Sequence, residues 1–111
     1  MMRSILFGIA ALALAVTTAS AEDFKHSANY FMPHCRNLIS ATPPGSFLEG
    51  RCGGIIEGIN YMDGSVCSPK EVTGEQLVRV VVAYIDARPA RMHESFPHLV
   101  VEALRDAWPC K

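Results

Sequence analysis

Four cysteines in a chain of 111 residues constrain the fold more than any other feature of this sequence. They are Cys35, Cys52, Cys67 and Cys110, and successive ones lie at least fifteen positions apart. Zinc sites usually begin with two cysteines separated by about two to four residues, and this chain has no such pair. An even number of cysteines in a short exported chain indicates disulfides. We therefore expect two disulfides rather than free thiols or a zinc site.

The N-terminus predicts that the chain is exported. Arg3 precedes an uncharged apolar run over residues 5–16, and small residues follow at 19–21. This is the pattern of a cleavable signal peptide. The apolar run would extend only about 18 Å as a helix, which is too short to cross a bilayer. We predict that residues 1–21 are a signal peptide and that 22–111 form the mature domain. With no cysteine at the cleavage site, we expect no lipid or membrane anchor.

The charge of the mature domain limits its partners. Removing residues 1–21 takes away only Arg3 of the ten basic residues, which leaves nine against eleven acidic ones and a formal charge of −2. Nucleic acids and anionic membranes are bound through basic surfaces, so neither is an expected partner. The length is that of one domain.

Apolar residues recur at spacings of three and four, which is the period of an amphipathic helix. Pro33 is expected to kink or split the first helix, and Pro97 to bend the last one or mark its beginning. The pattern predicts no strand and four helices, at about residues 23–40, 46–63, 73–88 and 90–107.

Two helices carry strong start signals. Ser46 with Glu49 forms a capping box, and Thr73 with Gln76 repeats the pattern. The helix after Thr73 is rich in β-branched residues, which would also suit a strand, but the cap favours a helix. Gly64 is suited to the left-handed position after the second helix.

Short connections between helices place neighbours antiparallel, and this predicts how the cysteines pair. The first helix ends where the second begins, so Cys35 and Cys52 can meet. Cys67 precedes the third helix and Cys110 follows the fourth, at the same end of that hairpin. We predict the pairs Cys35–Cys52 and Cys67–Cys110. The expected fold is all-α: a compact four-helix domain of two antiparallel hairpins stapled by two disulfides.

Three glycines are spaced at every fourth position of the second helix. Gly50, Gly54 and Gly58 fall on one face, with Gly53 beside them. Each glycine costs a helix about 1 kcal/mol relative to alanine, so something should offset the loss. Close packing inside the domain is the favoured explanation, and a protein-binding or dimer face is the alternative.

Patterns of catalytic residues are absent from the sequence. It lacks H-E-x-x-H, G-x-S-x-G and P-loop motifs. His34 adjoins Cys35, but a disulfide would occupy that thiol. His93 and His98 are five apart and lie on different faces of a regular helix. We expect no enzymatic activity, no metal site and no cofactor.

Several short motifs occur together in a fixed order. They are RCGGIIEG at 51–58, CSP at 67–69, VTGEQL at 72–77, VVVAYI at 80–85, RP at 88–89, RMH at 91–93, EAL at 102–104 and AWPC at 107–110. In order and spacing they resemble the Rap/Tai family of type VI secretion immunity proteins, although Pro97 interrupts the last helix.

The resemblance implies a periplasmic helical protein that binds a peptidoglycan amidase effector injected by other cells. Such a protein covers the effector's active-site cleft and needs no chemistry of its own, and relatives often form homodimers. Two alternatives are a periplasmic stress or holdase chaperone of the HdeA type and an orphan periplasmic binding protein.

Two loops are candidates for the contact with an effector. Tyrosine, methionine and arginine are favoured at the centres of protein interfaces. The candidate residues are Tyr61, Met62 and Asp63 at the end of the second helix, and Arg88, Arg91 and Met92 between the last two helices.

Overall fold

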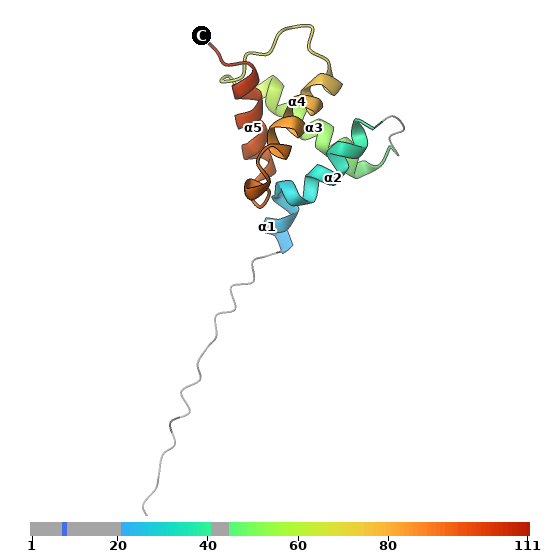
Figure 1. The fold of residues 1–111 in the computed structure, drawn as a ribbon, viewed down its shortest axis with the longest axis vertical. Helices are drawn as coiled ribbons and strands as arrows, with labels where there is room; N and C mark the ends of the chain where they lie inside the picture. Colours follow the sequence, from blue (N-terminus) through green and yellow to red (C-terminus); the bar gives the residue numbers. More distant parts are fainter. Residues whose placement is uncertain (1–7, 9–20, 41–44) are drawn as a thin grey trace, which may run out of the picture.

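The structure is a computed structural model that describes residues 21–40 and 45–111, together with Gly8 (Figure 1). The predicted signal peptide lies almost entirely outside these residues. The described part contains five α-helices, one 3-10 helix and no strand. They are α1 (Ala21–His26), α2 (Ala28–Leu38), α3 (Phe47–Met62), α4 (Gly74–Asp86), η1 (Pro89–Arg91) and α5 (Phe96–Ala107). The prediction of an all-α fold is confirmed.

Two helical hairpins share one core. Helix α2 packs mainly against α3, and α4 against α5, while α3 also contacts both α4 and α5. The rings of Phe31 in α2 and Phe96 in α5 stack with their centroids 4.7 Å apart, and both are fully buried. Burial of a side chain of this size contributes about 1.5–3 kcal/mol. These contacts join the two hairpins into a single domain.

Both predicted disulfides are present. The Cα atoms of Cys35 and Cys52 are 5.5 Å apart, and those of Cys67 and Cys110 are 5.1 Å apart. The first pair joins the end of α2 to the beginning of α3, and the second joins the segments that precede α4 and follow α5. Each bond therefore closes one antiparallel hairpin, as predicted.

The first predicted helix is split, but not at its proline. Helix α2 continues through Pro33, and the break is at Ser27. There the backbone pairs with the segment before α5: the N–H of Ala28 donates to the carbonyl of Glu94 at 3.0 Å, and Ser27 forms an isolated bridge with Ser95. A contact between residues so far apart in sequence has no local signal.

Helix α3 begins as predicted and ends differently. Ser46 and Glu49 form the complete capping box, which also buries the Glu49 side chain. At the other end, Gly64 does not adopt a left-handed conformation; the described glycine with positive φ is Gly45. Instead the chain is extended at Asp63, whose carboxylate accepts hydrogen bonds from the N–H and Oγ of Ser65 at 2.8 and 2.5 Å.

The last two helices follow their start signals. Thr73 caps α4 by accepting a hydrogen bond from the N–H of Gln76 at 3.1 Å, and the β-branched body is helical. Its buried residues lie on one stripe: Leu77, Val78, Val81, Val82 and Ile85. Helix α5 begins at Phe96 rather than near Ala90, with Pro97 in its first turn, where a missing N–H is tolerated. The segment before it forms η1.

Candidate functional site

A groove with a volume of about 560 Å³ lies where α3 meets the end of α2 and the first turns of α4. Its lining residues are Leu38, Ile39, Ser40, Glu49, Gly50, Gly53, Gly54, Glu57, Glu75 and Val78.

The glycines differ in what lies next to them. A Cβ atom placed on Gly50, Gly54 or Gly58 would meet no described atom within 4 Å. A Cβ on Gly53 would lie 3.2 Å from Cδ2 of Leu38, which is a tight contact. Thus Gly53 lies against α2, whereas the other three face open space in the monomer. Close packing within the described part of the domain does not account for those three, and a protein-binding face remains the prediction for them.

Two exposed aromatic residues flank this glycine face. Phe47 begins α3 and is 80% exposed, and Tyr61 lies in its last turn and is 87% exposed. Positions 47, 50, 54, 58 and 61 follow spacings of three and four, so they share one side of the helix. Phe47 was not among the contact residues predicted from the sequence, although its spacing with the glycines was a usable signal.

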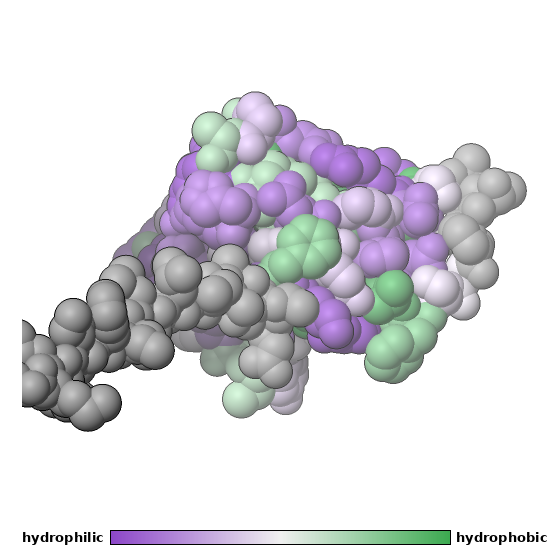
Figure 2. Space-filling model, turned by 90° about the horizontal axis from the view of Figure 1, so that it is seen from below, coloured by the Kyte–Doolittle hydropathy of each residue, from purple (hydrophilic) through white to green (hydrophobic). Residues whose placement is uncertain are grey.

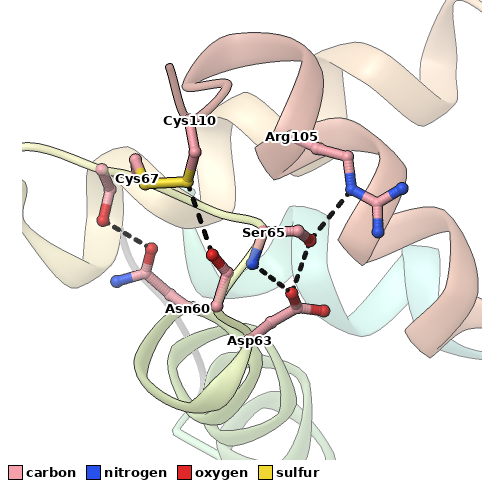
Figure 3. The surroundings of a disulfide bond; sticks show 8 residues. Asn60, Asp63, Ser65, Cys67, Arg105 and Cys110 are labelled. Atoms are coloured by element: carbon pink, nitrogen blue, oxygen red, sulfur yellow. Dashed lines mark hydrogen bonds between the residues drawn. A yellow bond between two sulfur atoms is a disulfide. The ribbon is translucent and has the colours of Figure 1, made fainter.

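The end of α3 that carries Tyr61 and Met62 is held by a cluster of contacts (Figure 3). Met62 is 78% exposed, and the next residue, Asp63, binds Ser65. These hydrogen bonds from Ser65 lower the pKa of Asp63 below its usual value, so the carboxylate is ionised at neutral pH. Arg105 of α5 donates in turn to Oγ of Ser65 at 3.0 Å.

The disulfide Cys67–Cys110 lies beside this cluster (Figure 3). The hydroxyl of Ser68 donates to Oδ1 of Asn60 at 2.7 Å, which ties the loop back onto α3. The loop is thus attached to α3 and to α5. Tyr61 and Met62 are therefore exposed side chains on a fixed support, an arrangement that lowers the entropic cost of binding.

The second predicted contact group is engaged within the domain. Arg91 forms ion pairs with Glu94 at 2.6 Å and with Glu102 at 2.7 Å. The hydrogen bonds from Arg91 lower the pKa of Glu102 to about 2, and the hydroxyl of Tyr84 adds a further bond. The same pairing lowers the pKa of Glu94 and raises that of Arg91. Arg91 therefore has an evident structural role in joining η1 to α5.

Its neighbours are also held in place. The guanidinium of Arg88 lies 3.6 Å from the centre of the Tyr84 ring and donates to the carbonyl of Tyr84. Met92 is half-buried against the core, and its carbonyl accepts from the N–H of Asn29 at 2.8 Å.

Figure 2 views the molecule from the end that carries α1 and shows mainly hydrophilic residues, with hydrophobic ones in small separate groups.

The two predicted contact groups do not form one surface. Tyr61 and Met62 lie next to the segment that precedes α4, whereas Arg88, Arg91 and Met92 follow its end. Helix α4 has 13 residues, which corresponds to a length of roughly 20 Å. The structure thus separates the groups by the length of a helix and leaves the Tyr61 end joined to the glycine face.

The cysteines and the other side chains that commonly bind metals have these surroundings in the described residues. All four cysteines are in disulfides, and in the described ranges no cluster of histidine, cysteine or acidic side chains could hold a metal ion. No helix in those ranges has the length and hydropathy needed to cross a membrane.

Comparison with known proteins places the chain in a family. Neither the curated proteins nor the solved structures gave a match. The family model described as Rap1a immunity proteins matches residues 27–110. That range begins at the break before α2 and ends at Cys110, so it includes both disulfides and the whole of α3. The chain therefore belongs to the Rap1a immunity protein family, which confirms the resemblance inferred from the sequence motifs.

Proposed function

We propose that this protein is a periplasmic immunity protein that binds a type VI secreted peptidoglycan amidase effector and blocks its active-site cleft. The observation that carries the proposal is the family match over residues 27–110. The predicted signal peptide supports the location, because it would export the chain to the compartment that holds peptidoglycan. Two disulfides support it as well, because they form and persist in oxidising compartments.

We place the contact at the end of α3, with Tyr61 and Met62 at its centre and the glycine face beside them. Both side chains are largely exposed and adjoin a loop fixed by a disulfide. An exposed tyrosine that becomes buried in a complex is a frequent centre of binding energy. The bare backbone at Gly54 and Gly58 would allow a partner to approach α3 closely.

The test is a rescue assay. The open reading frame beside the gene is exported to the periplasm of a test bacterium, with and without this protein, and lysis is followed. We expect lysis that the exported protein prevents and that a version retained in the cytoplasm does not. A harmless neighbour, or lysis that continues regardless, would contradict the proposal for this locus.

The Tyr61→Ala variant tests the contact surface. Replacing a central interface residue typically weakens binding by more than about tenfold, whereas an exposed position changes folding stability by less than about 0.5 kcal/mol. We expect weaker effector binding by calorimetry and an unchanged melting temperature. Phe24→Ala is the control, because Phe24 is also an exposed aromatic residue, 56% accessible, but lies in α1. If Tyr61→Ala binds the effector as tightly as Phe24→Ala does, this end of α3 is not the contact surface.

Homodimer formation and an acid-chaperone role remain further hypotheses. Sedimentation would reveal a homodimer.

A chaperone of the HdeA type must loosen in acid and expose apolar surface. Dye binding and near-ultraviolet circular dichroism that stay unchanged from neutral pH to about pH 3 would exclude the chaperone role.

A further inference from the structure

The two disulfides differ in their access to solvent. Cys35 and Cys52 are both fully buried in the core, with 0% exposure. Cys67 and Cys110 are both exposed. Reduction requires a thiolate to reach one sulfur atom of the bond, so access decides which bond reacts in the folded protein.

Few other contacts join the segments that the exposed bond connects. The N–H of Cys67 donates to the carbonyl of Trp108 at 3.0 Å, and Val66 forms an isolated bridge with Pro109. The Arg105–Ser65 hydrogen bond is a third connection, and it is exposed to solvent. An exposed polar contact such as the Arg105–Ser65 bond contributes little on its own, whereas Val66 is buried in the core at 8% exposure and anchors the bridge to Pro109. The disulfide is therefore the one covalent restraint between the end of α5 and the loop after α3, and it acts beside the buried anchor at Val66.

We propose that Cys67–Cys110 is a redox switch that a small dithiol opens in the folded protein, while Cys35–Cys52 stays closed. A thiolate of the dithiol attacks one sulfur, the Cys67–Cys110 bond breaks, and a mixed disulfide forms while the other cysteine leaves as a thiolate. The second thiol of the reagent then closes its own disulfide and releases the remaining cysteine. The dithiol is oxidised by two electrons, and the protein gains two thiols.

Opening the bond changes the support of the Tyr61–Met62 surface. The loop over residues 63–68, which directly follows Tyr61 and Met62, loses its covalent link to the end of α5, whereas α2, α3 and the buried bond remain. That this surface is the effector contact rests on the proposed function; the redox chemistry does not. If the proposed contact and the redox switch both hold, the protein binds its effector only when Cys67–Cys110 is oxidised. A chain still in a reducing compartment then lacks the ordered surface.

Thiol trapping tests the switch without an effector. The oxidised protein is treated with dithiothreitol at mildly alkaline pH without denaturant, quenched with iodoacetamide and mapped by mass spectrometry. We expect two labelled residues, Cys67 and Cys110, with retained far-ultraviolet circular dichroism and an altered fluorescence of Trp108, the single tryptophan. Labelling of all four cysteines together, labelling of Cys35 and Cys52 first, or loss of helix content would overturn the proposal. So would the absence of labelling until denaturant is added.

Hydrogen exchange tests the structural consequence. In the trapped protein, amides of residues 63–68 should exchange at least about tenfold faster than in the oxidised protein, while those of α2 should not change. The Cys67→Ala/Cys110→Ala variant should reproduce this pattern, and the trapped wild type provides the same measurement if that variant does not fold. Unchanged exchange at 63–68 would refute control of this surface.

An effector arm keeps the two proposals distinguishable. If the oxidised protein binds the effector, the trapped protein should bind it at least about tenfold more weakly, and equal affinity would refute the link to binding. If the oxidised protein does not bind at all, the proposed function fails, while the trapping result still decides the redox switch.

Discussion

Gly54→Ala tests whether the glycine face of α3 is open. Glycine in the interior of a helix costs about 1 kcal/mol relative to alanine, mainly through backbone entropy. A Cβ atom at position 54 meets no described atom within 4 Å, so no steric penalty opposes the gain. We expect the free energy of unfolding to rise by about 1 kcal/mol, which corresponds to an increase of about 4–8 °C in melting temperature for a domain of this size.

The assay is thermal unfolding by circular dichroism with both disulfides intact. Gly53→Ala is the matched control, because it gains the same helix propensity but its Cβ would press on Cδ2 of Leu38 at 3.2 Å. Its gain should therefore be smaller or absent. A Gly54→Ala variant less stable than the wild type would refute the open face, because only a neighbour packed on that face could oppose the gain. If the face is also the effector contact, the stabilised variant should protect cells less well.

Two further predictions concern stability. Glu102 has a folded-state pKa of about 2 against an ordinary value of 4.5, so its contribution is complete above about pH 5 and is lost as the pH falls toward 2. Glu102→Gln should therefore reduce the loss of stability over that range in denaturant titrations, and an unchanged pH dependence would contradict the pairing with Arg91. Thr73→Ala should lower the free energy of unfolding by about 1 kcal/mol, because the N–H of Gln76 loses its capping partner; a Thr73→Ser variant that keeps the acceptor should stay near the wild type.

Features coded by neighbouring residues were predictable from the sequence. The cap at Ser46, the cap at Thr73 and the disulfide pairing all follow from short spacings and short connections. Of the two roles predicted for Pro97, marking the beginning of α5 is correct, because proline fits the first turn of a helix, whereas the predicted start near Ala90 was wrong. The end of α3 was also encoded by neighbouring residues, because the Asp63 side chain forms a turn with Ser65. The prediction assigned this end to Gly64 instead and was wrong.

Features that depend on distant residues were not predictable. The break at Ser27 arises from backbone pairing with the segment before α5, so the proline in the same helix was a misleading signal. The pairing of Arg91 with Glu102 likewise depends on how η1 folds back onto α5. The candidate contact at Tyr61 was predicted from residue type alone. Its exposure and its fixed support became visible only in three dimensions.

The order of the disulfides along the chain has a consequence for how the protein is made. Cys35 pairs with the next cysteine in sequence, and Cys67 pairs with the last, so the two covalent loops neither overlap nor nest. A chain that enters an oxidising compartment N-terminus first exposes Cys35 and then Cys52, which can pair before Cys67 arrives. When Cys110 arrives, Cys67 is then the only cysteine still unpaired. Joining the cysteines in order of arrival gives the native connectivity directly, and its formation requires no exchange of partners.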